Sequence, residues 1–197
     1  MAFDLARDRL DWDASDQVRR GDLLGTTTLV QAGEEAVTLD LLPLVMTVAR
    51  QGRLEEEIYL TSFLWEEAKH TEFFRRWLDE VPRIAGQDLH EYIGPNYRRL
   101  FFEELPAAMC RLLEDGSNEA LARALTTYNM IIEGVLAETG YHSYRLQLEE
   151  GRLFPGLAGA LKLISRDEAR HIRFGVYMLQ LLIQQDGAMC DVVQRRM

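Results

Sequence analysis

Hydrophobic residues recur along the chain at the three- and four-residue spacing that is typical of amphipathic helices. Between residues 54 and 81, charged residues that form an outer face are interspersed among apolar residues. The apolar positions are Ile58, Leu60, Leu64, Phe73, Phe74 and Leu78. Runs with the two-residue alternation of a strand are scarce. The pattern therefore predicts an all-α protein.

Capping and helix-breaking residues divide this pattern into four long helices. The predicted helices cover residues 15–51, 54–81, 118–150 and 156–185. Ser15-Asp16 can cap the first helix, Gly52 ends it, and Pro43 should kink or interrupt it. Shorter helices, broken by Gly94-Pro95 and Pro106, are expected over residues 88–115, and only a brief tail is expected after residue 187.

This order of elements predicts a ferritin-like four-helix bundle with one long crossover that contains extra short helices. With 197 residues, the chain has the length of a single domain covering residues 1–197.

Composition excludes several classes of function. The formal net charge of −10 argues against a nucleic-acid partner, which would require a basic face. Cys110 and Cys190 are far apart and in no metal-binding or redox pattern, so two reduced thiols are expected. The N-terminus lacks the layout of a signal peptide, and the longest apolar stretch, residues 39–49, is too short to span a membrane. A cytoplasmic protein is expected.

Two Glu-x-x-His pairs, Glu67/His70 and Glu168/His171, carry the chemistry in this sequence. Residues three apart on a helix point to one side, so each pair can grip one metal ion. A lone glutamate precedes each pair at a similar distance: Glu34 lies 33 residues before Glu67, and Glu133 lies 35 residues before Glu168. Four helices that each supply ligands predict a dinuclear metal site of the ferritin-like kind.

The chemistry of these side chains supports a metal site. Carboxylate oxygen with imidazole nitrogen suits iron, manganese or zinc. Four buried carboxylates without cations would repel one another and raise each other's pKa, so such a cluster should bind metal or stay partly protonated. Glu66 and Asp167 immediately precede the ligand glutamates, and we expect them to accept hydrogen bonds from the ligand imidazoles. The alternative is that both are ordinary surface acids.

Four segments resemble the ligand-binding oxidases related to the ribonucleotide reductase small subunit: AGEEAVTLD, YLTSFLWEEAKH, TYNMIIEGVLAETGYHSY and RDEARH. The resemblance implies a heterodinuclear manganese–iron cofactor, with a di-iron form possible, that uses O2 for the two-electron oxidation of a C–H bond. It also implies a long-chain fatty acid or similar apolar ligand and a homodimer. A further implication is an ether cross-link between a carbon of Val37 and the phenolic oxygen of Tyr128.

The positions of these two residues can be tested against helix geometry. Val37 lies three residues after Glu34 and therefore on the same helix face. Tyr128 lies five residues before Glu133, which on a regular α-helix rotates it about 140° away. A π-bulge between them would turn both inward, and such bulges are common at functional sites. Without the resemblance, a core valine and a core tyrosine would explain both residues.

Several related functions share the metal motif. A true reductase subunit carries a radical tyrosine shortly after the first Glu-x-x-His, whereas the residues here are Thr71, Glu72, Phe73 and Phe74. The remaining alternatives are a ferritin-class ferroxidase or iron-binding protein, a fatty-aldehyde oxygenase, and a reductase subunit that stores its radical on the metals alone.

Overall fold

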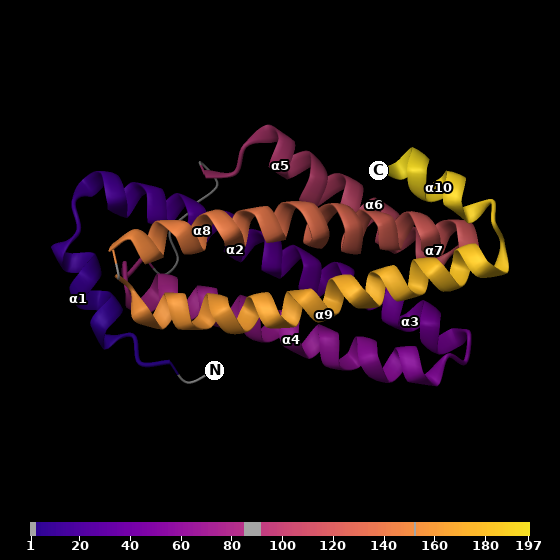
Figure 1. The fold of residues 1–197 in the computed structure, drawn as a ribbon, viewed down its shortest axis with the longest axis horizontal. Helices are drawn as coiled ribbons and strands as arrows, with labels where there is room; N and C mark the ends of the chain where they lie inside the picture. Colours follow the sequence, from indigo (N-terminus) through magenta and orange to yellow (C-terminus); the bar gives the residue numbers. More distant parts are fainter. Residues whose placement is uncertain (1–2, 85–91, 152) are drawn as a thin grey trace.

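The computed structural model describes residues 3–84, 92–151 and 153–197, and all its regular elements in these ranges are helical (Figure 1). The long helices are α2 (Gln17–Asp40), α4 (Leu54–Glu80), α9 (Pro155–Gln185) and a continuous run of α7 (Asn118–Leu125), η4 (Thr126–Ala137) and α8 (Glu138–Gly151). The short elements are α1 (Ala6–Ala14), α3 (Leu42–Arg50), α5 (Pro95–Arg99), η2 (Leu100–Glu104), α6 (Leu105–Cys110), η3 (Arg111–Leu113) and α10 (Met189–Arg196).

The four long helical segments pack as the predicted bundle. Helix α2 packs along α4, α9 packs along η4 and α8, and α4 contacts α9. The crossover from α4 to α7 contains α5, η2, α6 and η3. The ferritin-like, all-α fold class is thus confirmed, although part of the predicted short-helix region, residues 88–91, lies outside the described residues. No helix within the described ranges is long and apolar enough to cross a membrane.

The ends of the first long helix follow the sequence signals. The Asp16 side chain accepts a hydrogen bond from the backbone N–H of Arg19 at 2.8 Å and caps α2. The helix is interrupted at Leu41, and Pro43 occupies the first turn of α3, where a missing N–H costs little. Gly52 ends α3 with a φ of 70°, a left-handed conformation that glycine adopts without strain.

Two helices, α1 and α10, were not predicted from the pattern. Helix α1 has the sequence ARDRLDWDA, in which polar residues dominate and no clear apolar stripe is visible. Helix α10 lies in the segment expected to be a brief tail, and its eight residues give little more than two turns of pattern. It packs against α7 at the end of the bundle where the chain finishes (Figure 1).

Helix α1 caps the start of α9 with a buried carboxylate. Asp8 accepts hydrogen bonds from the backbone N–H groups of Gly156 and Leu157, both at 2.8 Å, and from the indole N–H of Trp77 at 3.0 Å. The first N–H groups of a helix have no partner inside that helix. Because α9 begins at Pro155, Asp8 supplies the acceptor that the start of α9 lacks.

The middle of the third long segment is π-helical. The η4 segment replaces the α-helical hydrogen bonds with i→i+5 bonds, so residues five apart lie on nearly the same side. Tyr128 is fully buried and Glu133 is only 2% exposed. The predicted π-bulge between these two residues is therefore confirmed, and it extends over the whole of η4.

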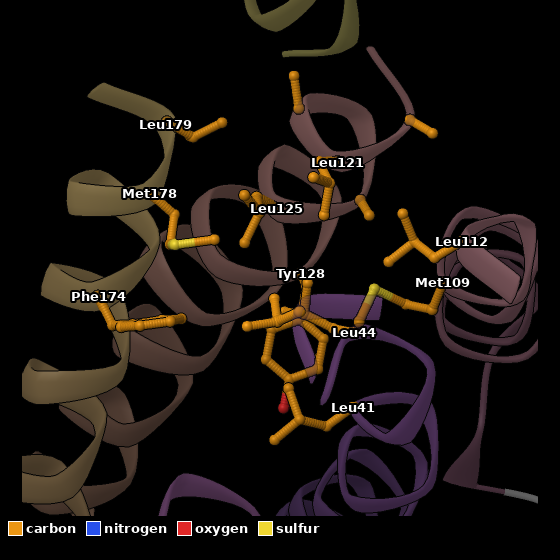
Figure 2. Close-up of a cluster of buried hydrophobic side chains, with 14 of the residues drawn as sticks. Leu41, Leu44, Met109, Leu112, Leu121, Leu125, Tyr128, Phe174, Met178 and Leu179 are labelled. Carbon is orange, nitrogen blue, oxygen red and sulfur yellow. The ribbon is translucent and has the colours of Figure 1, made fainter. Parts of the chain in front are cut away.

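Two apolar clusters lie along the bundle, with the predicted metal ligands between them. On α4, Phe63 belongs to one cluster and Phe73 to the other. On α9, Ile164 and Phe174 divide in the same way. Figure 2 shows the cluster nearer the C-terminus, where the ring of Tyr128 lies among leucine and methionine side chains from several helices. Both ends of the polar site are thus closed by packed side chains.

We predict that Asp8→Ala lowers the free energy of unfolding by about 1–3 kcal/mol, because buried N–H groups lose their acceptor. Urea unfolding of the metal-free protein measures the effect. The control is Asp4→Ala, which removes an exposed carboxylate that accepts from Ala6 on the same part of the chain. Equal unfolding midpoints for the two variants would contradict the capping role of Asp8.

Candidate metal centre

All six predicted ligand residues converge at the centre of the bundle. Each is buried, with exposed fractions between 0% and 6%. Helix α2 supplies one residue, α4 two, η4 one and α9 two: Glu34, Glu67, His70, Glu133, Glu168 and His171. Their possible ligand atoms form two groups of four, within which all atoms lie within 4.8 Å of one another. The arrangement can hold two metal ions side by side.

Two glutamates belong to both groups. Glu67 and Glu168 are shared, so each can bridge the two metal positions. Glu67 turns one oxygen toward each imidazole, with Oε1 2.8 Å from Nδ1 of His171 and Oε2 3.8 Å from Nδ1 of His70. Glu168 also turns one oxygen toward each imidazole. Its Oε1 lies 3.3 Å from Nδ1 of His70, and its Oε2 lies 3.6 Å from Nδ1 of His171.

The unshared ligands distinguish the two positions. Glu34 and His70 belong to one position, and Oε2 of Glu34 lies 3.4 Å from Nδ1 of His70. Glu133 and His171 belong to the other position. Each position therefore offers three carboxylates and one imidazole, a hard-oxygen set with one borderline nitrogen that suits iron, manganese or zinc.

One polar atom of each of the six side chains makes no hydrogen bond within the protein. These buried atoms are Glu34 Oε2, Glu67 Oε1, His70 Nδ1, Glu133 Oε1, Glu168 Oε1 and His171 Nδ1. Buried polar atoms are otherwise almost always paired, so a set of six facing one another indicates a ligand between them. Two cations would satisfy all six, and the residues fit a dinuclear centre.

Burial also shapes the protonation of these groups. It raises the pKa of Glu34 and of Glu133 well above the usual range for a carboxyl group. Burial acts the same way on Glu67, but the two neighbouring imidazoles outweigh burial and lower its pKa. The surrounding carboxylates overcome desolvation and raise the pKa of His171 to about 12. The metal-free cluster therefore retains protons, which bound cations would displace.

Glu66 and Asp167 lie where they can orient the two imidazoles. His171 Nε2 is 2.9 Å from Oε2 of Glu66, and His70 Nε2 is 3.2 Å from Oδ2 of Asp167. The pairing is crossed, because each acid serves the histidine of the opposite helix. A hydrogen bond at Nε2 leaves Nδ1 free to bind metal and fixes the orientation of the ring.

Arg170 joins the two acids. Its Nη2 donates to Oε1 of Glu66 and to Oδ1 of Asp167, both at 2.6 Å. One guanidinium group thus links the partners of both metal-facing histidines. Arg170 was not identified from the sequence, although its position three residues after Asp167 places the two on one helix face.

Further residues that sequence reasoning missed surround the ligands. The hydroxyl of Tyr141 donates to Oε1 of Glu34. Asn129 donates through Nδ2 to Oε2 of Glu133 at 2.8 Å. Phe63 stacks on His171 with the ring centres 3.6 Å apart. The four-residue spacing of Asn129 and Glu133 could have indicated their contact, whereas Tyr141 and Glu34 are 107 residues apart.

The structure brings Val37 and Tyr128 together. The Tyr128 hydroxyl donates to the backbone oxygen of Val37 at 3.4 Å. Both residues belong to the same apolar cluster, and Val37 also borders the cavity next to the glutamates.

A cavity of about 280 Å³ reaches the metal ligands from one side. It is bordered by α2, by the segment from α5 to η2, and by the junction of η4 with α8. The four ligand glutamates line its inner end, and most of its exposed surface is apolar, contributed by Leu29, Val30, Val37, Phe101, Leu136 and Ala137.

These features define a dinuclear carboxylate site in a ferritin-like bundle, and solved structures show the same arrangement of the chain. One is an R2-like ligand-binding oxidase variant, with valine replaced by leucine, that carries an anaerobically reconstituted Mn/Fe cofactor. Its sequence is 41% identical to this chain, and the two structures superpose with a TM-score of 0.95. The match covers 98% of this chain and 71% of the oxidase chain. A tyrosine-to-phenylalanine variant with anaerobically reconstituted Mn/Fe gives the same values.

A third structure is the R2-like ligand-binding oxidase with aerobically reconstituted Mn/Fe cofactor after a long soak. It is 42% identical, with a TM-score of 0.95, over 98% of this chain and 67% of its own. No protein-family model matches the chain. At this identity and coverage, the chain belongs to the family of R2-like ligand-binding oxidases. The resemblance found in the sequence is confirmed, and the oxidase hypothesis is favoured over its three alternatives.

We predict that Arg170→Gln weakens metal binding by about 10–100-fold at both positions, because both imidazole partners lose their common anchor. Anaerobic titration with Mn²⁺ measures the affinities. The control is Arg173→Gln, which removes the same positive charge at an exposed position of the same helix. Wild-type affinities in Arg170→Gln, or equal losses in the two variants, would contradict this role.

Proposed function

We propose that this protein is an oxidase in which the six buried residues hold a Mn/Fe centre that activates O2 for the two-electron oxidation of a C–H bond. The observation that carries the proposal is the set of six unpaired ligand atoms beside an apolar cavity. When bound, the two ions would supply two electrons to O2 as each passes from the +2 to the +3 state, and the C–H substrate would supply the other two.

The surrounding residues would hold the ions and exclude water. Glu67 and Glu168 would bridge the two positions, while the other two glutamates and the histidines bind one ion each. The apolar clusters on both sides keep bulk water from the centre. Because both positions offer the same donor types, the placement of manganese and iron would depend on geometry and metal supply.

The cavity favours a long apolar ligand with a carboxylate head, such as a long-chain fatty acid. Its walls are apolar up to the metal ligands, and the residues that border it in the described part of the chain include no lysine, arginine or histidine. A carboxylate entering the cavity would therefore find its positive partner in the metal ions. The hydrocarbon chain would lie between α2, η2 and α8.

Val37 and Tyr128 are the proposed site of an ether cross-link. Forming the C–O bond would remove one hydrogen atom from a carbon of Val37 and one from the Tyr128 hydroxyl, which together amount to two protons and two electrons. O2 would accept these two electrons and the two that the bound metals supply, and the two released protons with two from solvent would complete two water molecules. The contact between the Tyr128 hydroxyl and Val37 supports the pairing, and the β-carbon of valine offers a relatively weak tertiary C–H bond.

We predict that exposing Mn²⁺/Fe²⁺-loaded protein to O2 lowers its intact mass by two hydrogen atoms, with tandem mass spectrometry locating the link between Val37 and Tyr128. Tyr128→Phe lacks the phenolic oxygen and Val37→Ala lacks the tertiary carbon, so both should keep their full mass. Unchanged mass in the wild type after O2 uptake, or a loss that persists in Val37→Ala, would argue against this cross-link.

The cavity yields a second prediction. A β-carbon at Gly140, which lines the cavity, would meet no atom within 4 Å, so a larger side chain can enter the space without displacing the fold. Gly140→Leu should weaken binding of a long-chain fatty acid such as palmitate by about tenfold or more while leaving Mn²⁺ binding unchanged.

Isothermal titration of the Mn²⁺-loaded protein with palmitate measures this effect. Gly21→Leu is the matched control, since Gly21 is an exposed helical glycine that also has open space around it. Wild-type palmitate affinity in Gly140→Leu would show that the ligand does not occupy this cavity.

A further inference from the structure

The two glutamates that are not shared between the metal positions are held by different neutral donors. Oε1 of Glu34 accepts from the hydroxyl of Tyr141, and Oε2 of Glu133 accepts from the amide of Asn129. In each glutamate the other oxygen has no hydrogen-bond partner and faces the metal position. Each of these glutamates thus has one oxygen engaged by the protein and one left for an ion.

The bridging glutamates are arranged differently. Glu67 and Glu168 each turn one oxygen toward His70 and the other toward His171. A carboxylate that has both oxygens available can bridge two ions. One that has an oxygen engaged by an O–H or N–H donor is biased toward binding through the other oxygen.

Tyr141 also occupies a particular place among these residues. It comes from α8, is only 2% exposed, and reaches across to Glu34 on α2. Its side chain borders the apolar cavity beside Gly140 and Val37, whereas Asn129 does not border this cavity. The donor pair therefore distinguishes two positions whose ligand types are otherwise the same.

We propose that Tyr141 is a positioning residue that keeps Glu34 as a one-oxygen ligand of the metal position formed with His70. The phenol engages Oε1 and leaves Oε2 directed at the ion, which keeps Glu34 from chelating or from moving to a bridging mode. The inference rests on the proposed function for the presence of the ions, but it concerns ligand geometry and not the oxidation itself.

The test compares Tyr141→Phe with Tyr144→Phe under anaerobic conditions, with Mn²⁺ as the only metal. Tyr144 is a buried tyrosine one turn further along α8, and its hydroxyl pairs with Thr27 instead of a metal ligand. Phenylalanine keeps the ring that borders the cavity and removes only the hydroxyl. Tyr141→Phe should weaken Mn²⁺ binding at one position by about 10–100-fold, and Tyr144→Phe should leave both positions unchanged.

Anomalous diffraction from Mn²⁺-loaded crystals then identifies the affected position. The expected result for Tyr141→Phe is reduced occupancy at the Glu34/His70 position, with Glu34 rotated so that both oxygens approach the metals. Equal affinities in the two phenylalanine variants would overturn the proposal. So would wild-type crystals in which Glu34 already binds manganese through both oxygens, a result that does not depend on any variant.

These outcomes separate the inference from the proposed oxidase activity. If Tyr141→Phe loses manganese selectively while the loaded wild type oxidises no C–H bond, the positioning role stands and the proposed function fails. If the wild type shows the mass loss while Tyr141→Phe binds manganese normally, the proposed function stands and the inference fails.

Discussion

The burial of four carboxylates and two imidazoles at one point in a helix bundle is the constraint on which this structure depends. Their charges cannot be solvated there, so they must be neutralised by protons or by cations. One atom of each residue lacks a partner in the protein, while most of the remaining polar atoms are bonded to a second layer of side chains. The fold thus arranges a site for two ions before any ion binds.

The local departures from a regular bundle serve this site. The π-helical segment turns Tyr128 and Glu133 inward together, although their spacing would separate them on an α-helix. Helix α1 anchors the start of α9, the helix that carries Glu168 and His171. The crossed pairs of acids and histidines, joined through Arg170, tie α4 to α9 at the level of the ions.

The bundle and the six converging residues could be predicted because both depend on local spacing: helical periodicity, stop signals and the three-residue step of Glu-x-x-His. The π-bulge could be expected because the family resemblance gave Tyr128 and Glu133 inward roles that their five-residue spacing does not allow on an α-helix. Contacts between distant helices could not. Tyr141 on α8 meets Glu34 on α2 only in the folded bundle, and the Asp8 cap depends on where a largely polar short helix docks.

The dinuclear metal centre is tested most directly by anomalous diffraction at the manganese and iron edges from crystals of protein loaded with both metals. We expect two ions about 3.5–4 Å apart, bridged by Glu67 and Glu168, with Glu34 and His70 on one ion and Glu133 and His171 on the other. A single ion, or ions bound outside these six residues, would contradict it.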